Sequence, residues 1–368
     1  MKITVNRKNF LDALVVGASM AGKAKAVPIL ECMKCRVSGN SITIVSTDVE
    51  CWVLKRTTID TTDTDGEFCV NPNDITKALK SLKDDVVGLS VTDSLITVKH
   101  SKGVIEFPAY DYKAFPIATK GENATTISIK SELLFNWLNK AKLFVANDDL
   151  RPVMNGMYLY IKNGEMGVCA TDAHKLFTDF VAFDGDATLD IHAILSSRTF
   201  APLMNMINGT DSVSMTIDAK NITFATSDAK ISCRIIEGNY PNFKMILPAS
   251  YCNRVVASKN DFIGAISRVS MFTNATTSLV KLSFNDNNTC YFDGQDINFN
   301  KKAADECHIA LDGSGLVIGV KGDYMVTCLN AIDSDEVILE MNISDKPIVF
   351  KDSANPNCRI VLMPMLLG

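Results

Sequence analysis

The sequence lacks the residue patterns that metal and nucleophilic sites require. Only four histidines occur in 368 residues, and none of them is in an HxxxH or HExxH spacing. The motif "CMKC" at residues 32–35 has no second cysteine pair, which a zinc site needs. No P-loop or GxGxxG follows a predicted strand, and Ser196 and Ser197 have no nucleophile-elbow context. We therefore expect no catalytic activity, no cofactor and no metal.

Long apolar runs are also missing. No stretch of 18 apolar residues occurs, so we expect no membrane span, and the start "MKITVNRKNF" has no apolar core of a signal peptide. The eleven cysteines are an odd number and are scattered from Cys32 to Cys358. This distribution favours a reduced, cytoplasmic protein that uses cysteine as a small apolar residue over one with a disulfide framework.

The composition is that of an ordinary globular protein, with 47% hydrophobic and 21% charged residues. The net charge of −5 predicts solubility and argues against a general coat for nucleic acid, although it leaves local basic patches open. The length predicts two to three domains.

The chain contains three copies of one pattern. Pro28 and Pro152 are 124 residues apart, as are Asp48 and Asp172. Each of these two copies reads as a strand, a polar turn and a second strand that ends in "TD", and a weaker third copy covers residues 278–296. Agreement of several landmarks at one spacing indicates repeated domains rather than coincidence among short strands.

Two helices recur in each copy. Apolar residues at i, i+3 and i+4 predict first helices at 6–20, 130–146 and 258–272, and second helices at 71–82, 196–207 and 321–332. The remaining segments alternate like half-buried strands. We predict an α+β fold of three domains, each with two helices packed on two antiparallel sheets. The predicted boundaries are 1–122, 123–248 and 249–368.

In their order and spacing, several segments resemble the bacterial DNA polymerase III beta subunit, the sliding clamp of the DNA clamp family. They are "MKITVNRKNFLDAL", "VPIL", "NGM", "ATDAHKL", "GNYPNFKMILP" and the terminal "VLMPML". The resemblance covers essentially the whole chain. It implies a head-to-tail homodimer whose six domains form a ring around double-stranded DNA, with the helices lining the hole. It also implies a cytoplasmic, nucleoid-associated processivity factor with no catalytic activity of its own.

Such a ring must slide, so it requires loose attraction to phosphates and no reading of bases. Each predicted helix carries at least one basic residue. The alternative is that lysine is only the default polar residue of a solvated helix face. The resemblance favours contact with DNA for a set that we name the basic set: Lys23, Lys25, Lys77, Lys80, Lys140, Lys142, Arg198 and Arg268. Asn73 and Asp74 stand where the family often has basic residues.

The uncharged end "VLMPMLLG" is unusual, because chain termini are usually polar. By itself it favours a last strand packed into the core. The resemblance instead implies a hydrophobic pocket for short linear peptides, in which methionine accepts varied partners. We name the implied residues the tail site: Met154, Thr171, Ala173, His174, Lys175, Leu176, Pro241, Met245, Ile246, Tyr324, Val361, Met363, Pro364, Met365 and Leu366.

The tail site departs from the family at three positions. Met245 and Leu366 stand where family members often have arginine, and Ala173 replaces the more usual glycine of "ATDGH". These differences predict a site that is less basic and more apolar. At the dimer interface, "KGVIEF" and "SMFTN" are similar to the family's segments, with Val104, Met271 and Phe272 as candidate contacts.

The implied partners are a DNA polymerase catalytic subunit, an ATP-dependent clamp loader, and repair polymerases, ligase or mismatch-repair proteins that bind through short motifs. Two other readings remain open. One is an enzyme that uses Asp172 with His174, or the cysteines. The other is a scaffold of clamp fold that binds peptides but does not encircle DNA.

Overall fold

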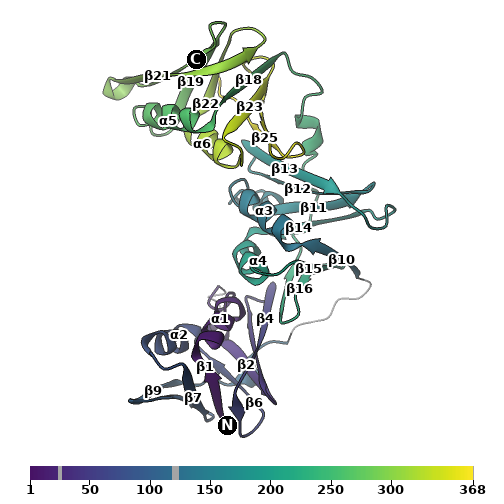
Figure 1. Cartoon of the computed structure of the whole chain (residues 1–368), viewed down its shortest axis with the longest axis vertical. Coiled ribbons are helices and arrows are strands. Elements are labelled where there is room, and N and C mark those ends of the chain that lie inside the picture. Colours follow the sequence, from purple (N-terminus) through teal and green to yellow (C-terminus); the bar gives the residue numbers. More distant parts are fainter. Residues whose placement is uncertain (24–26, 118–123, 368) are drawn as a thin grey trace. The chain divides into compact units, whose positions relative to one another are not determined.

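The computed structural model describes residues 1–23, 27–117 and 124–367. The chain forms two compact units, Met1–Asn136 with Arg198–Ile235, and Trp137–Ser197 with Ile236–Gly368. The strands of the described residues form three antiparallel sheets, and each sheet lies within one unit (Figure 1).

The first unit contains two of the sheets. The five-stranded sheet has the order β5 (Thr61–Thr62), β1 (Lys2–Asn6), β7 (Val86–Val91), β8 (Leu95–His100) and β9 (Gly103–Pro108). The eight-stranded sheet has the order β10 (Thr125–Lys130), β15 (Ser212–Ile217), β16 (Asn221–Ala225), β17 (Ala229–Arg234), β4 (Cys51–Thr58), β3 (Ser41–Thr47), β2 (Met33–Ser38) and β6 (Gly66–Val70).

The second unit is built on one sheet of twelve strands. Its order is β14 (Ile191–Ser196), β11 (Gly156–Lys162), β12 (Glu165–Thr171), β13 (Lys175–Ala182), β25 (Arg359–Leu362), β24 (Ile348–Asp352), β23 (Glu336–Met341), β18 (Asn253–Ser258), β21 (Lys301–Asp312), β20 (Thr289–Asp296), β19 (Leu279–Asn285) and β22 (Leu316–Lys321).

Sheets run from one repeat into the next. In the eight-stranded sheet, β17 of the middle repeat pairs with β4 of the first. In the twelve-stranded sheet, β13 of the middle repeat pairs with β25, the strand at the end of the chain. Continuous pairing leaves no free strand edge where repeats join, and this explains why part of the middle repeat belongs to each compact unit.

The described residues contain six α-helices, close to the predicted positions: α1 (Arg7–Gly17), α2 (Pro72–Ser81), α3 (Ser131–Ala141), α4 (Phe200–Ile207), α5 (Lys259–Ser270) and α6 (Gly322–Asn330). Side-chain caps explain several of their starts. Asn6 accepts a hydrogen bond from the Asn9 N–H at 3.0 Å, and Ser258 accepts one from the Asp261 N–H at 3.3 Å. None of the described helices is long and apolar enough to cross a membrane.

The helix pair of the first repeat packs its apolar stripe on the sheets. In the first repeat, α1 and α2 lie side by side (Figure 1) and bury Phe10, Leu14, Ile75 and Leu79 in one core with strand residues such as Leu89. Their opposite faces remain polar, as the predicted spacing requires. The two helices thereby present basic side chains on one side of the first repeat.

The "TD" turns have the same geometry in the first two repeats. Asp48 Oδ1 accepts the Cys51 N–H at 2.8 Å, and Asp172 Oδ1 accepts the Lys175 N–H at 2.9 Å. The residue after each aspartate is left-handed, with φ of 81° at Val49 and 75° at Ala173. Glycine takes this conformation without strain, which accounts for the glycine that the family favours at Ala173.

We expect the substitution Val49→Gly to stabilise the protein by about 1 kcal/mol. A β-branched side chain at positive φ costs about 1–2 kcal/mol, which exceeds the entropy cost of glycine. Thermal unfolding should show a higher midpoint. The control is Val86→Gly, the same change at an exposed position of β7, which should lower the midpoint. A lower midpoint for Val49→Gly would contradict the strain argument.

Candidate functional site

The end of the chain is held by main-chain hydrogen bonds beyond its last strand. Within the sheet, Val361 of β25 lies opposite Leu176 of β13. After the strand, the Met363 N–H donates to the His174 carbonyl at 2.9 Å, and the Met365 N–H donates to the Gly319 carbonyl at 2.8 Å. The tail is therefore fixed at two points while its side chains stay free to make other contacts.

Gly319 permits the second of these bonds. A Cβ atom at this position would lie 2.7 Å from the Met365 carbonyl oxygen and 2.9 Å from the Leu367 side chain. Sequence reasoning missed Gly319, although a glycine inside a strand pattern signals close approach of another backbone. It also missed Leu367, whose side chain is 37% exposed beside the tail site.

A buried apolar cluster forms the floor of the tail site. Leu176 and Val361 pack with Phe243 of the loop that follows β17. In that loop Tyr240 stacks on Tyr158 of β11, with ring centroids 4.9 Å apart and an interplanar angle of 11°. Burial raises the pKa of Tyr240, which keeps the phenol neutral. This packing fixes the loop that carries Pro241, Met245 and Ile246.

A polar wall stands beside the floor. The rings of His174 and Tyr324 are 5.7 Å apart. The Lys175 amine lies 5.4 Å from the Tyr324 ring centroid, and the Lys321 amine lies 4.3 Å from it. Two cations against one aromatic ring hold it by cation–π attraction. Lys321 is the last residue of β22, directly before α6 begins at Gly322, and Tyr324 lies in the first turn of that helix.

The predicted tail-site residues differ in exposure. Four are buried and serve as support: Thr171, Lys175, Leu176 and Val361. Five are partly buried: Met154, Pro241, Tyr324, Pro364 and Met365. Six are exposed: Ala173, His174, Met245, Ile246, Met363 and Leu366. Met154 lies in a short 3₁₀ helix before β11, Pro152–Asn155.

The exposed apolar side chains are what this site offers to a partner. Met245 is 82% exposed, Leu366 is 86% exposed and Met363 is 39% exposed. Large apolar groups left in water beside an ordered floor are typical of interaction surfaces. Methionine adapts its shape to different apolar partners, so the site suits short peptides with apolar anchors.

The carboxylate of Asp172 makes its hydrogen bonds within its own turn. Its Oδ1 accepts the N–H groups of His174 and Lys175, each at 2.9 Å, and its Oδ2 binds the Lys175 amine at 2.6 Å. The Lys175 side chain is only 8% exposed. This arrangement orients the turn that carries His174 and does not favour an acid–base pair of Asp172 with His174. The described residues contain no group of three or more metal-ligating side chains.

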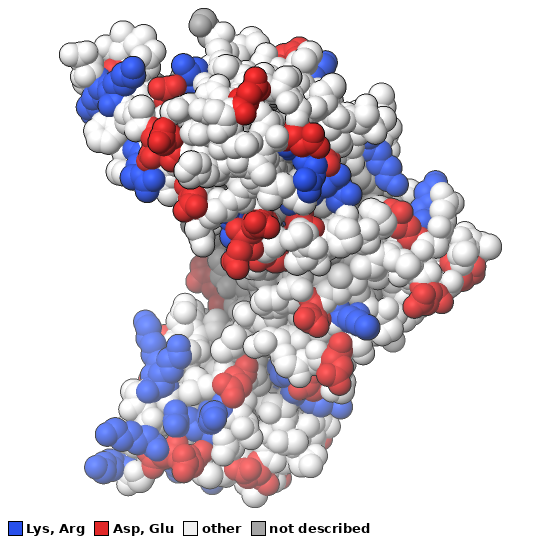
Figure 2. All heavy atoms as spheres, turned by 45° about the horizontal axis from the view of Figure 1, so that its top comes forward, with Lys and Arg blue, Asp and Glu red and all other residues white. Residues whose placement is uncertain are grey.

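Most of the basic set is exposed. Lys23, Lys77, Lys80, Lys142, Arg198 and Arg268 are all exposed, and Lys25 lies outside the described residues. Figure 2 shows basic side chains gathered over the end of the first unit that carries α2 and β9. The exposed lysines of α2, β8, β9 and their flanking turns are Lys77, Lys80, Lys83, Lys99 and Lys102.

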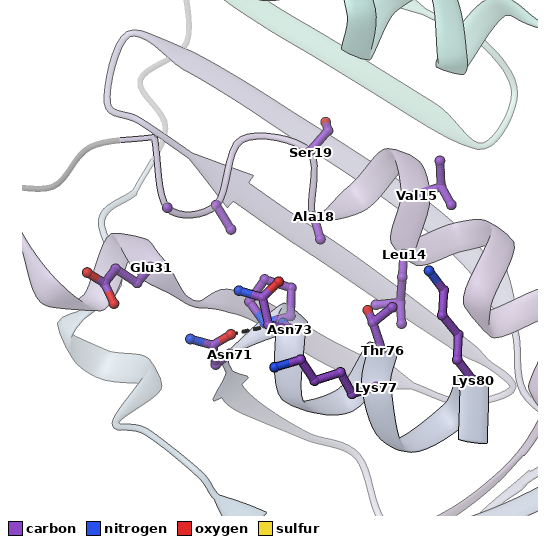
Figure 3. A pocket seen from close by; sticks show the side chains of 13 residues that line it. Leu14, Val15, Ala18, Ser19, Glu31, Asn71, Asn73, Thr76, Lys77 and Lys80 are labelled. Carbon is purple, nitrogen blue, oxygen red and sulfur yellow. Dashed lines mark hydrogen bonds between the residues drawn. The ribbon is translucent and has the colours of Figure 1, made fainter. Parts of the chain in front are cut away.

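Lys77 and Lys80 line a cavity of about 580 Å³ between α1 and α2. Lys80 extends from α2 toward α1, and Lys77 extends toward Asn71 and Asn73 at the start of α2 (Figure 3). Neither lysine has a carboxylate in an ion pair among the described residues. Glu31 lies at the opposite end of the cavity from Lys80 (Figure 3).

Three members of the basic set have acidic partners. The Arg268 Nε lies 2.6 Å from the Asp305 Oδ2 and lowers the pKa of that carboxyl. Arg198 lies 3.9 Å from Glu50. Lys140 is only 8% exposed and its amine lies 2.6 Å from Asp333. Lys140 is therefore the member of the set with the least free charge to offer.

The candidate dimer contacts lie on exposed surfaces. Val104 is 58% exposed on β9, the edge strand of its sheet. Met271 and Phe272 follow α5 and are 69% and 43% exposed. In β21, the part up to His308 pairs with β20, and only Ile309–Asp312 pairs with β18. Among the described residues the first part of β21 thus has one open edge.

Family models match the chain in three consecutive segments. The N-terminal domain of the DNA polymerase III beta subunit matches residues 1–119, the central domain 128–242 and the C-terminal domain 244–366. Together they account for nearly the entire chain and agree with the threefold repeat.

Whole-length relatives agree. The chain is 22% identical to the beta sliding clamp of Pseudomonas aeruginosa over all of both chains. A crystal structure of that sliding clamp bound to griselimycin matches with a TM-score of 0.95 at 21% identity, again over all of both chains. The beta subunit of Thermotoga maritima matches with a TM-score of 0.93 at 19% identity and the same coverage. The chain therefore belongs to the DNA polymerase III beta subunit family, the sliding clamps, and has their fold of three clamp domains.

Proposed function

We propose that this chain is a DNA polymerase processivity factor that closes around duplex DNA as a head-to-tail homodimer and acts without catalysis. The observation that carries the proposal is the tail site, where main-chain bonds from Met363 and Met365 hold exposed apolar side chains over a buried floor. The domains that we propose are 1–122, 123–248 and 249–368. Family membership supports the ring. The open strand edges of β9 and of the first part of β21 can pair between two chains and so close it.

The proposed seam joins β9 of one chain to β21 of its partner. In β9 the Ala109 N–H bonds to the Ser94 carbonyl, so by alternation the backbone groups of Val104 and Glu106 face away from β8. In β21 the Ile309 N–H donates to the Asn288 carbonyl. By the same alternation, the backbone groups of Ala304 and Glu306 face away from β20. Pairing of the two open edges would satisfy these groups and bring Val104 toward the partner.

Topological linkage explains how weak contacts give long residence on DNA. A closed ring does not dissociate when a few phosphate contacts break, so scattered lysines suffice. Sequence-independent attraction also lets the ring slide, because no base is read. Lys77 and Lys80 are well placed for such contact, since both are exposed, line one cavity and lack an ion-pair partner among the described side chains.

The tail site tethers the polymerase to the ring. A tethered enzyme rebinds the primer end at high effective concentration, which raises processivity without any new chemistry. The same site would serve repair polymerases, ligase and mismatch-repair proteins through short motifs. Opening the ring is assigned to a separate ATP-dependent clamp loader. Because DNA is the partner, we place the protein in the cytoplasm at the nucleoid.

We expect the double substitution Lys77→Ala and Lys80→Ala to weaken duplex binding and its dependence on salt. Each lost phosphate contact lowers the slope of log affinity against log salt by about 0.9, so the pair should lower it by roughly 2. Fluorescence anisotropy with a short linear duplex over a salt series measures this slope. Lys162→Ala is the matched control, because Lys162 is paired with Asp190 at 2.6 Å. An unchanged slope in the double variant would remove these lysines from the DNA interface.

Solution mass tests the ring directly. Light scattering at micromolar and nanomolar concentrations should give a species of twice the 40.2 kDa chain mass at both. A monomer at every concentration would contradict the closed ring and favour a peptide-binding scaffold that does not encircle DNA.

A further inference from the structure

Two thiols face each other where the first and middle repeats join. Cys51 is the first residue of β4, and Cys233 lies in β17, directly opposite it in the antiparallel register. Their sulfur atoms are 2.7 Å apart, and both cysteines are free. The residues are separated by 182 positions in the sequence, so this contact exists only because the repeats share a sheet.

The hydrogen bonds around the pair identify its type. The Arg234 N–H donates to the Glu50 carbonyl at 2.8 Å, and the Arg56 N–H donates to the Asp228 carbonyl at 2.7 Å. Hydrogen-bonded and non-hydrogen-bonded pairs alternate along antiparallel strands, so Cys51 and Cys233 form a non-hydrogen-bonded pair. In such pairs the Cα atoms are about 4.5 Å apart and the Cβ atoms are closest, which lies within the range that a disulfide bridges.

A second cross-strand cysteine pair provides a contrast. Cys290 of β20 lies opposite Cys307 of β21. The Ile309 N–H donates to the Asn288 carbonyl at 3.0 Å, so alternation places Cys290 and Cys307 in a hydrogen-bonded pair. There the Cβ atoms stand farther apart, at about 5.5 Å, which lies beyond the roughly 3.5–4.5 Å that a disulfide bridges. The same chain thus holds one pair suited to a disulfide and one that is not.

The Cys51–Cys233 pair is protected but lies near the end of the strands. Both side chains are buried, at 3% and 2% exposure, while Val49 and Glu50 in the adjoining turn are exposed. The neighbouring Cys51 thiol and burial raise the pKa of Cys233. Fraying of the turn would admit a small oxidant to the pair.

We propose that Cys51 and Cys233 are an oxidation site at which hydrogen peroxide forms a disulfide between the first and middle repeats. One thiol attacks peroxide, the O–O bond breaks, and a sulfenic acid and one water form. The second thiol then attacks the sulfenic sulfur, an S–S bond forms and a second water leaves. The two sulfur atoms lose two electrons in total, and the peroxide gains them. This proposal does not depend on the proposed function.

The bond would add a covalent link between two repeats that are already joined by strand pairing and by ion pairs such as Lys55 with Asp228 at 2.6 Å. A covalent link between positions 182 residues apart removes much of the freedom of the unfolded chain. Oxidation should therefore raise the thermal unfolding midpoint, and dithiothreitol should reverse the rise.

Peptide mapping of the intact full-length protein tests the proposal. The protein is treated with hydrogen peroxide, the remaining thiols are alkylated under denaturing conditions, and tryptic peptides are analysed by mass spectrometry without reduction. Segments 37–55 and 231–234 contain one cysteine each, as do 282–301 and 303–321. Exposed Cys252 reports that peroxide has reached the protein.

The expected result is a linked peptide 37–55/231–234, with two titratable thiols lost in addition to that of Cys252, in excess over any 282–301/303–321 link. The link should be absent in Cys51→Ala. Two results would overturn the proposal. One is the absence of the 37–55/231–234 link after Cys252 is fully oxidised. The other is a link between Cys290 and Cys307 that forms as readily.

Discussion

Replacing Met363 and Met365 with alanine should weaken binding of a polymerase-derived peptide by about 50-fold. Each truncation removes roughly 1.2 kcal/mol of apolar contact, and the two together about 2.4 kcal/mol. The tail itself should stay in place, because the bonds to the His174 and Gly319 carbonyls come from the main chain. The loss would therefore report side-chain contact with the partner and not loss of the fold.

The measurement is fluorescence anisotropy with a labelled peptide from the C-terminal tail of the cognate polymerase catalytic subunit. Ile343→Ala is the control, since Ile343 is an apolar residue with 55% exposure outside the tail site. The solution mass and the thermal midpoint of the double variant should equal those of the parent protein. Unchanged affinity would contradict the assignment of the tail site as the peptide-binding site.

Aspartate at Val104 or at Phe272 should convert the dimer to monomers at concentrations where the parent protein is dimeric. A head-to-tail ring has two seams. In a dimer of either variant, the substitution therefore places an unpaired carboxylate in each of the two seams. At a cost of about 3 kcal/mol per seam, the dimer should weaken by at least about a thousandfold. Light scattering on dilution measures the change, and Ile343→Asp is the control.

Mixing the two variants tests the head-to-tail arrangement itself. A mixed dimer has one seam that carries both substitutions and one seam that carries neither. A species of twice the chain mass should therefore reappear when Val104→Asp and Phe272→Asp chains are combined. If the mixture stays monomeric while both variants keep their thermal midpoint, Val104 and Phe272 do not meet across a common seam.

The sequence predicted the elements better than their partners. Apolar spacing placed all six helices, and one difference is instructive. The stripe predicted a helix to residue 146, but α3 ends at Ala141. The Phe144 N–H instead bonds to the Ala141 carbonyl in a turn, and the Phe144 ring packs against Phe177. Periodicity reports burial, and a buried turn satisfies it as well as a helix does.

Strand pairing across repeats could not be predicted from the sequence. Alternation marks β4 and β17 as strands but does not say that Trp52 lies opposite Ser232. The facing thiols of Cys51 and Cys233 follow from that register alone. The partners of Lys140 could not be predicted for the same reason, because its ion pair with Asp333 spans 193 positions.

The chain end can be interpreted either as a last strand packed into the core or as a pocket for short peptides. Each interpretation is supported by a different part of the chain end. Residues Arg359–Leu362 form a strand within a sheet, as predicted for a last strand packed into the core. Beyond Leu362 the chain leaves the strand, and Met363 and Leu366 expose apolar side chains. Composition alone does not separate these parts, because both are apolar. The separation depends on where β13 begins and on the absence of a side chain at Gly319.

A ring that is linked topologically to DNA should be retained on circular DNA. The protein is loaded onto nicked circular duplex DNA by the cognate ATP-dependent loader and then passed through a sizing column in salt that screens phosphate contacts. The protein should stay with the circle and be lost as soon as the circle is cut once. Equal loss from circular and linear DNA would contradict topological linkage.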